Sequence, residues 1–210
     1  MSKKKHTYTL SLGPEIVKFF LPHRQPFLMV DRIESYTRKP IPSMECTRQL
    51  SINEPVFAGH FPQVSIFPGA YILEGLCQTC QLLCTFILYE EAFDEHGVPK
   101  DTFLDALKNV EMGYRFEPGF QADAAQQFFE AIEEKGTPKL GVTASTQMKF
   151  IHPVFAGETL RLRARFQRKV DQLWRYEVEA ESNNRIVSKG VVTAAIMEQP
   201  LLDILSRNKT

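Results

Sequence analysis

The sequence predicts a single α+β domain in which one long buried helix packs against a mostly antiparallel sheet of four to six strands. The stretch from Ala70 to about Tyr89 is apolar on nearly all sides, which is typical of a helix buried on most of its surface. Four strand-like segments follow one another after Leu140. Because these strands come after the helix, the chain does not alternate strand and helix as a βαβ fold does. A length of 210 residues suits one such domain better than two.

The composition excludes several classes of protein. Hydrophobic residues make up 43% of the chain and charged residues 24%, as in an ordinary globular protein. Lys and Arg together number 25, as do Asp and Glu, so the basic excess of a nucleic-acid-binding protein is missing. No apolar stretch reaches the length of a membrane span without a polar interruption, and the N-terminus lacks the apolar core of a signal peptide. We therefore expect no nucleic-acid partner, no membrane span and a cytoplasmic location.

The segments before the long helix are expected to be a tail, a short helix, a loop and a strand. The basic run Lys3–His6 is typical of a solvated tail, and Pro14–Phe20 predicts a short helix. The prolines of "LPHRQPF" predict a loop, after which Phe27–Ile33 is expected to begin an apolar strand or helix. Met44–Ile52 alternates loosely and predicts a strand. A loop rich in Pro and Gly then leads to the long helix.

The region of residues 90–138 has a different, helical character. The segments "PKDTFLDALKNV" and "QADAAQQFFEAIEEKG" predict two amphipathic helices, joined by a loop that contains Glu117-Pro118-Gly119. The second helix is expected to end at Gly136.

The segments predicted as strands after Leu140 are Gly141–Phe150, Glu158–Arg168, Leu173–Ser182 and Arg185–Met197. In "TLRLRARF" apolar residues alternate with arginines, which places the arginines on one face of the sheet. A three-residue turn around Asp171 sets these arginines opposite glutamates of the next strand, in the pairs Arg165/Glu177, Arg163/Glu179 and Arg161/Glu181. A docking patch for an acidic partner is the alternative. The matching register of the acids favours the cross-strand ladder.

Three of the four cysteines, Cys77, Cys80 and Cys84, lie on the long apolar helix. A CxxC pair can indicate a metal or redox site. Here the pair has no second Cys/His pair at metal-site spacing, and it falls inside a helix rather than at its start. We therefore predict buried packing residues and no metal site.

Two titratable residues stand where their neighbours favour burial. Glu74 interrupts an apolar stretch, and burial is expected to raise its pKa and make it a proton donor near neutral pH. Alternatively, Gln78 one helical turn on satisfies a buried carboxyl. Two roles are open for His60. It is either a general base at neutral pH or a loop histidine that only forms a hydrogen bond with the backbone. The helix start at Pro68 and Gly69 offers N–H groups to a developing negative charge. Together these groups suit proton removal next to a carbonyl and loss of a leaving group from the next carbon.

Four segments carry a resemblance to a known family: "LPHRQPFLMVDRI", "SINEPVFAGHFP", "FPGAYILEGLCQ" and "FIHPVFAGETLRLRARF". In order and wording they resemble the bacterial 3-hydroxyacyl-acyl carrier protein dehydratases, which are hot-dog-fold enzymes of fatty-acid synthesis. The resemblance covers residues 15–84 and 140–197, and the paired GHFP and PGxxxLE motifs are highly specific. It implies one hot-dog domain over residues 1–210, with an antiparallel sheet wrapped around a central helix and a helical insertion at about 90–138.

The resemblance also implies a role for each matched position. His60 matches the catalytic histidine, and Glu74 matches the catalytic acid, which the neighbouring subunit usually contributes. Gly69 matches the residue whose backbone N–H polarises the thioester carbonyl. Gln78, near the acid, and Pro68 are expected to support the site. Residues expected along the substrate tunnel are His23, Phe27, Phe67 and Tyr71, with a structural role as the alternative for His23.

The reaction implied is the dehydration of a 3-hydroxyacyl thioester to a trans-2-enoyl thioester. Neutral His60 takes the α-proton, the Gly69 amide holds the enolate oxygen, and protonated Glu74 helps the 3-hydroxyl leave as water. Glutamate rather than aspartate at position 74 favours dehydration without double-bond migration. The acyl chain is carried on the phosphopantetheine arm of an acyl carrier protein, and neither a metal nor an organic cofactor is expected. The assembly implied is a homodimer, or a trimer of such dimers.

Three features depart from the family pattern: Gln63-Val64-Ser65 in place of Gly-x-Pro, Gln25 in place of an aromatic residue, and the insertion. The insertion is expected to cover the acyl tunnel, enlarge the dimer interface, bind a dedicated carrier protein, or simply extend the packing. It also favours a specialised lipid or polyketide pathway over ordinary fatty-acid synthesis. Two other functions fit the same fold, an acyl thioesterase and a non-catalytic acyl-binding protein. The intact His60/Glu74 pair weighs against both.

Overall fold

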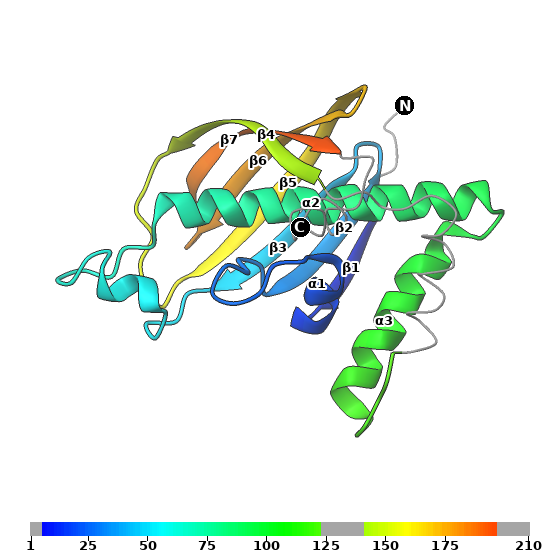
Figure 1. The fold of residues 1–210 in the computed structure, drawn as a ribbon, viewed down its shortest axis with the longest axis horizontal. Coiled ribbons are helices and arrows are strands. Elements are labelled where there is room, and N and C mark those ends of the chain that lie inside the picture. Colours follow the sequence, from blue (N-terminus) through cyan, green and yellow to red (C-terminus); the bar gives the residue numbers. More distant parts are fainter. Residues whose placement is uncertain (1–5, 123–140, 197–210) are drawn as a thin grey trace, which may run out of the picture.

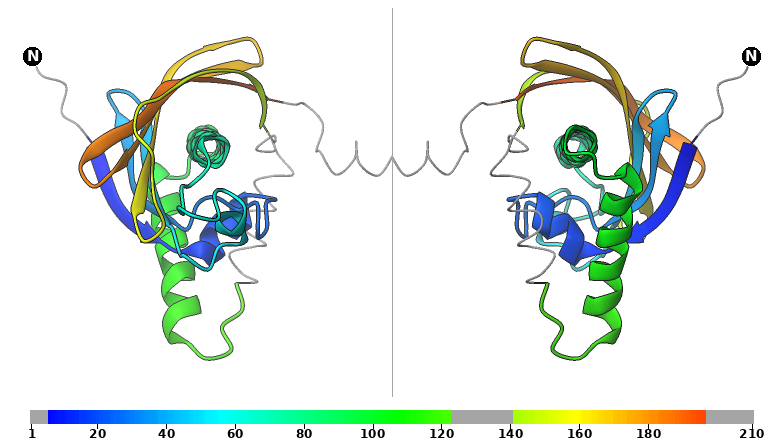
Figure 2. Two further views of the ribbon diagram at one scale, coloured as in Figure 1. Left: turned by 90° about the vertical axis from the view of Figure 1, so that its left-hand side faces the viewer. Right: turned by 90° about the vertical axis from the view of Figure 1, so that its right-hand side faces the viewer.

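A computed structural model describes residues 6–122 and 141–196 of the chain. It shows a seven-stranded antiparallel sheet against one long helix (Figure 1). The elements in chain order are β1 (His6–Leu12), α1 (Pro14–Phe20), β2 (Arg32–Lys39), β3 (Ser43–Gln49), the short 3-10 helix η1 (Pro55–Ala58), α2 (Gly69–Glu95), α3 (Lys100–Phe116), β4 (Gly141–Phe150), β5 (Thr159–Val170), β6 (Leu173–Ser182) and β7 (Arg185–Ile196). The strands lie in the order β1-β2-β3-β5-β6-β7-β4. Viewed along α2, the sheet curves around the helix (Figure 2), which confirms the predicted α+β class and central helix.

The sheet has more strands than predicted because its N-terminal part holds three, β1, β2 and β3. The predicted strands of the C-terminal part are all confirmed, as is the strand over Met44–Ile52, which is β3 in the structure. The tail prediction is wrong at His6, where β1 begins and pairs with β2. The sequence of β1 does alternate, with Tyr8, Leu10 and Leu12 separated by Thr9 and Ser11, but the run is short and only Leu10 and Leu12 of its residues are buried.

The apolar segment Phe27–Ile33 was expected to begin a strand or helix, and this is wrong for most of its length. Strand β2 begins only at Arg32, and the residues before it form a loop. Leu28 and Met29 are nevertheless buried, because the loop lies directly on α2. The backbone N–H of Met29 donates to Oε1 of Gln78 on that helix at 2.8 Å. The apolar side chains therefore fill the core without a regular element.

Helix α2 is the predicted long helix, and it runs beyond Tyr89 to Glu95. It starts at Gly69, directly after Pro68, which lies at the N-cap position in an extended conformation. By length and composition α2 could cross a membrane, but 67% of its most apolar window is buried inside the structure. Burial of this kind identifies it as the core helix of the wrapped sheet.

The three cysteines of α2 are packing residues, as predicted. Cys80 and Cys84 are buried against the sheet, Cys77 is partly buried, and all three are free thiols. Burial raises the pKa of each thiol, that of Cys84 to about 12. Because metal binding and redox attack need the thiolate, these side chains are unsuited to either role at neutral pH.

The hairpin of β5 and β6 has the predicted register but a different turn. All three predicted Arg/Glu pairs face each other across the strands. The turn has two residues, Asp171 and Gln172, and a bulge between Phe166 and Arg168 restores the register. Asp171 has φ +53°, a left-handed conformation that aspartate tolerates in turns. The pattern of charges predicts the paired residues correctly, but it does not reveal the bulge.

The first insertion helix is confirmed as α3, and it is part of the core. Phe103, Leu104 and Leu107 of α3 are almost completely buried, and the ring of Phe103 stacks on Tyr89 of α2 at a centroid distance of 5.2 Å. Helix α3 lies at the C-terminal end of α2, away from the loop that precedes α2 (Figure 1). The second predicted insertion helix falls mainly on residues 123–136, outside the described part of the chain. Among the roles expected for the insertion, the burial of α3 fits an extension of the core packing.

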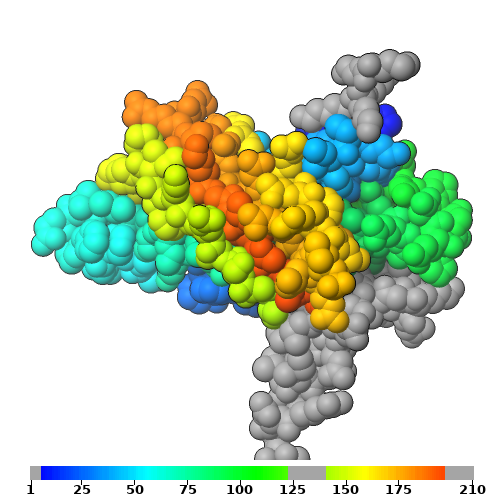
Figure 3. All heavy atoms as spheres, turned by 90° about the horizontal axis from the view of Figure 1, so that it is seen from above, coloured from blue at the N-terminus to red at the C-terminus, as the bar shows by residue number. Residues whose placement is uncertain are grey.

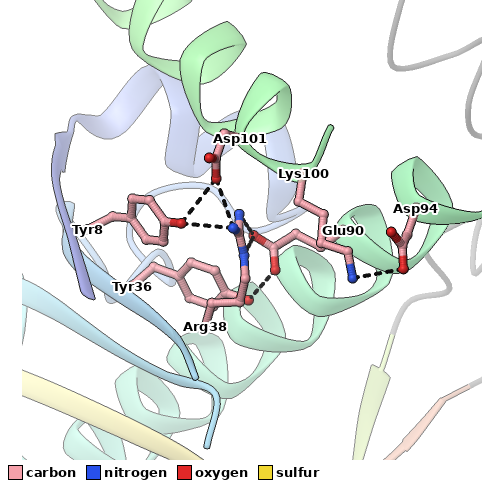
Figure 4. Close-up of polar contacts among 7 residues, drawn as sticks. All are labelled: Tyr8, Tyr36, Arg38, Glu90, Asp94, Lys100 and Asp101. Atoms are coloured by element: carbon pink, nitrogen blue, oxygen red, sulfur yellow. Dashed lines mark hydrogen bonds and ion pairs between the residues drawn. The ribbon is translucent and has the colours of Figure 1, made fainter. Parts of the chain in front are cut away.

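A buried polar cluster ties α3 to the sheet and to α2 (Figure 4). The guanidinium of Arg38 on β2 donates two hydrogen bonds to Oε1 of Glu90, at 2.6 and 2.8 Å, and one to Asp101 at 2.8 Å. The hydroxyl of Tyr36 donates to Oε2 of Glu90 at 2.9 Å. Burial and the adjoining Glu90 raise the pKa of Tyr36, so its hydroxyl remains a donor. The charge of Glu90 is thus paired although its side chain is only 5% exposed.

Candidate active site

His60 lies in the loop between η1 and α2, and its ring orientation is set by the backbone of the same loop. Nδ1 lies 2.9 Å from the carbonyl oxygen of Ile66. Because a carbonyl oxygen only accepts, Nδ1 carries the proton and Nε2 keeps its lone pair. The imidazole is partly buried and stacks on Phe61 at a centroid distance of 4.2 Å. This tautomer leaves Nε2 available as a general base.

His60 and Gly69 line the same cavity, of about 310 Å³, at the N-terminal end of α2. Its walls are mainly apolar, with Phe67, Ile72 and Val154 among them. Gly69 is the first residue of α2, where backbone N–H groups have no partner in the helix, and its own N–H donates no hydrogen bond within the described residues. An N–H at the start of a helix favours negative charge nearby.

Gly69 also has a steric role at the mouth of this cavity. A Cβ at this position would lie 3.1 Å from the ring of Phe150, the last residue of β4. Glycine therefore lets the aromatic ring of the strand approach the first turn of the helix.

The opposite wall comes from residues 150–154, which precede β5 by only a few residues. This segment is held by hydrogen bonds from the N–H of Ile151 to Val187 and from the N–H of Phe67 to Val154, each 2.8 Å long. It brings a second histidine, His152, into the lining of the cavity. These residues were not predicted as part of the site, and their only signal was the resembling motif that contains "FIHPVFAGE". Their contact with the His60 loop is made by backbone hydrogen bonds between segments far apart in the sequence.

Glu74 belongs to a different group of residues. Its Oε1 accepts a hydrogen bond of 2.8 Å from Nε2 of Gln78, so the predicted partnership of these two side chains is confirmed. Gln78 also bonds the carbonyl of Phe27 and the N–H of Met29, each at 2.8 Å, which fixes the preceding loop on α2. Nε2 of His23, in the same loop, lies 3.7 Å from Oε1 of Glu74. The Glu74 side chain is 23% exposed, so the expected deep burial is not reached within one chain.

The structure therefore divides the predicted site residues into two groups. His60, Gly69 and Phe67 line the cavity, and Tyr71 contacts the edge of the Phe67 ring at a centroid distance of 5.7 Å. Glu74 is absent from the residues that line this cavity. The residues gathered around the carboxyl are Gln78, His23 and Phe27. A larger hollow of about 710 Å³ on the outer face of the sheet is lined by the charged ladder and contains none of the predicted site residues.

Comparisons with known proteins show the family of this chain. Residues 21–115 match the FabA-like domain family and residues 126–189 match the Thioesterase superfamily. The 3-hydroxyacyl-[acyl-carrier-protein] dehydratase FabZ of Pseudoalteromonas translucida is 27% identical, over 90% of this chain and 95% of that protein. The FabZ dehydratase of Thioalkalivibrio sulfidiphilus is 31% identical, over 84% of this chain and 91% of that protein.

Among solved structures, the dehydratase heterocomplex ApeI:P from Xenorhabdus doucetiae superimposes with a TM-score of 0.51 at 13% identity. The superposition covers 90% of this chain and 96% of the other, and it supports the hot-dog fold. These two relatives match 90% and 84% of this chain. The chain belongs to the FabZ family of 3-hydroxyacyl-[acyl-carrier-protein] dehydratases.

Proposed function

We propose that this protein removes water from 3-hydroxyacyl chains carried on an acyl carrier protein and forms the trans-2-enoyl thioester. The proposal is supported by His60 and Gly69 in one apolar cavity, where neither Nε2 of the imidazole nor the Gly69 N–H has a hydrogen-bond partner among the described residues. A base and an oxyanion donor at one cavity are the groups that abstraction of a proton next to a thioester carbonyl requires.

The reaction proceeds by two coupled proton transfers. Nε2 of His60 takes the proton from C2 of the substrate, and the resulting enolate oxygen accepts a hydrogen bond from the Gly69 amide. Electrons from C2 then form the C2=C3 double bond as the C3–O bond breaks. Glu74 gives its proton to the departing hydroxyl, which leaves as water. The proton on His60 finally passes to Glu74, directly or through solvent water, so both side chains return to their starting protonation states without any cofactor.

The complete site requires a second copy of the chain, because Glu74 lies outside the cavity of His60. Strand β4 supports such a pairing, since it is the edge of the sheet and most of its residues are exposed. It runs along the surface beside β7 (Figure 3). Apolar side chains exposed at this edge include Val142, Phe150 and Ile151. We propose a homodimer joined along β4, in which each copy presents its Glu74 to the His60 of the other, with a trimer of dimers as the larger assembly.

The acyl carrier protein is the proposed partner, and the cytoplasm the proposed location. Fatty-acid synthesis and a specialised lipid or polyketide pathway both supply 3-hydroxyacyl chains of this kind.

A thioesterase is the second candidate, because residues 126–189 match the Thioesterase superfamily. That reaction needs an activated water at the thioester carbon instead of an acid at the 3-hydroxyl. The Gly69 N–H would serve both reactions, and so would Glu74, as a carboxylate that activates water or as a protonated acid at the 3-hydroxyl. Only the product distinguishes the two reactions.

Intact mass spectrometry of the carrier tests the proposal. The purified protein is incubated with 3-hydroxyacyl carriers of several chain lengths, and separately with the corresponding enoyl carriers. We expect loss of one water from the first set and gain of one water by the second, because a catalyst accelerates both directions. Release of free carrier would make the protein a thioesterase. Unchanged carriers with stable binding would make it an acyl-binding protein.

A further inference from the structure

His23 approaches Glu74 from the loop between α1 and β2. Its Nε2 lies 3.7 Å from Oε1 of Glu74, the same oxygen that accepts the hydrogen bond from Gln78. The backbone around His23 is held by Arg24, whose Nη1 donates to the carbonyls of Leu21 and His23, each at 2.8 Å. The imidazole is therefore placed beside the carboxyl by a fixed loop.

The surroundings of the ring determine which nitrogen of His23 carries the proton. Nδ1 is buried and has no hydrogen-bond partner within the described residues. A proton on Nδ1 would leave a buried donor unpaired, and it would set the lone pair of Nε2 against the oxygen of Glu74. With the proton on Nε2, the buried Nδ1 is an unpaired acceptor, but the repulsion between the two lone pairs is removed and an N–H points toward Oε1. Burial has the largest effect on the pKa of His23 and lowers it. The charge of Glu74 raises this pKa and that of Arg24 lowers it further. The neutral ring is therefore the favoured form.

These contacts make the two oxygens of Glu74 inequivalent. Oε1 faces two N–H groups, from Gln78 and His23, while Oε2 accepts no hydrogen bond within the described residues. A carboxylic acid whose one oxygen accepts N–H groups carries its proton on the other. The proton of Glu74 is therefore available on Oε2, the oxygen that faces no protein donor.

We propose that His23 is a positioning residue of the dehydration reaction, which holds Oε1 of Glu74 so that Oε2 delivers the proton to the departing hydroxyl. This rests on the proposed function. The separation of 3.7 Å is longer than a hydrogen bond, and we expect it to shorten when substrate binds, since catalytic contacts tighten in the bound complex. As charge develops on Glu74, the N–H of His23 stabilises it. This assignment replaces the structural or tunnel-wall role expected from the sequence.

A matched pair of amide variants tests the proposal. Gln in place of His23 puts an amide N–H near the position of Nε2, whereas Asn reaches only as far as Nδ1. We expect His23→Asn to lower kcat for dehydration by about 10-fold or more with KM changed less than about twofold, and His23→Gln to retain most of kcat. Without the donor, the carboxylate form is less stable, so the alkaline limb of the kcat–pH profile moves to higher pH in His23→Asn only. His96→Gln, at the exposed end of α2, is the control and should leave kcat unchanged.

The outcomes separate this proposal from the proposed function. Equal kcat values and equal pH profiles for His23→Asn and His23→Gln would overturn the role of His23 if the unsubstituted enzyme dehydrates its substrate. An equal loss in both variants with matching loss of thermal stability would show a purely structural role and would overturn it too. An unsubstituted protein that dehydrates no 3-hydroxyacyl carrier would overturn the proposed function and this inference with it.

Discussion

His60 shows how one backbone contact prepares a side chain for chemistry. The carbonyl of Ile66 fixes the proton of the imidazole on Nδ1, and the lone pair of Nε2 is then the only basic position on the ring. The alternative role of His60, a loop histidine that bonds the backbone, and its catalytic role are therefore not exclusive. The backbone bond is the device that selects the useful tautomer.

Replacement of His60 by Ala is expected to lower kcat by about 10²- to 10⁴-fold, the usual contribution of a general base. The cost in stability should be about 1 kcal/mol, because the side chain is partly exposed and makes one hydrogen bond. Dehydration kinetics and urea unfolding of the same preparation measure the two effects. If His60→Ala loses so much stability that unfolding alone explains its lower kcat, a catalytic role is contradicted.

The burial of His23 can be tested by the dependence of protein stability on pH. Its pKa is lowered in the folded protein by burial, so the unfolded chain binds the proton more readily. Stability should therefore fall as pH drops below about 6.5, the ordinary value for histidine, and level off below the folded pKa. Urea unfolding of the parent and His23→Gln proteins at about pH 7.5 and 5.5 measures the change. We expect the parent to lose more stability than the variant over this interval, and equal losses would contradict burial of a neutral imidazole.

At the scale of elements, helix α3 depends on a buried charge cluster as well as on apolar packing. Arg38 is the shared partner of Glu90 on α2 and Asp101 on α3, and it is 13% exposed. Removal of one member of a buried pair leaves the other charge without compensation, which is more costly than loss of the pair.

Substitution of Arg38 by Met should therefore lower the free energy of unfolding by about 3–5 kcal/mol. The double variant Arg38→Met, Glu90→Leu should recover most of this loss, because no buried charge remains. Lys100→Met is the matched control, since its pair with Asp94 is exposed and contributes less than about 1 kcal/mol. Urea denaturation measures all three, and equal costs for the Arg38 and Lys100 variants would contradict the account of the cluster.

Most of the helices and strands could be predicted from the sequence, but parts of the fold and of the candidate site could not. Strands β4 to β7 and helix α2 have clear apolar patterns, and their positions were predicted closely. Strand β1 was missed although Tyr8, Leu10 and Leu12 alternate with polar residues, because the run is short and adjoins the basic run Lys3–His6. Phe27–Ile33 was misassigned because its apolar residues pack as a loop on Gln78. In the site, local spacing placed His60 and Gly69 together. It could not reveal residues 150–154, which reach the cavity only when the sheet has formed.

At the scale of the whole molecule, the proposed dimer would explain two features, the exposed edge of β4 and the absence of Glu74 from the cavity of His60. A long exposed edge strand tends to pair with another strand, and natural proteins usually cover it. If two copies pair along β4, the edge is covered and the Glu74 group of each copy can approach the cavity of the other.

Substitution of Val142 by Asp tests this interface. Each dimer would bring two new carboxylates into the same contact, so we expect dissociation to monomers with the circular dichroism spectrum unchanged. Val170→Asp, at the exposed end of β5, makes the same change away from the β4 edge and should leave the dimer intact. Sedimentation velocity distinguishes the species. A monomeric parent protein, or equal behaviour of the two variants, would contradict pairing along β4.

The most direct test of the account is complementation between His60→Ala and Glu74→Gln chains, each inactive alone. If the acid and the base come from different copies, a mixed dimer contains one site with both native residues and one with neither. Co-refolding of equal amounts makes about half of the dimers mixed, so we expect about a quarter of the parent dehydratase activity to return. A mixture that stays inactive although mixed dimers form would contradict an active site shared between two chains.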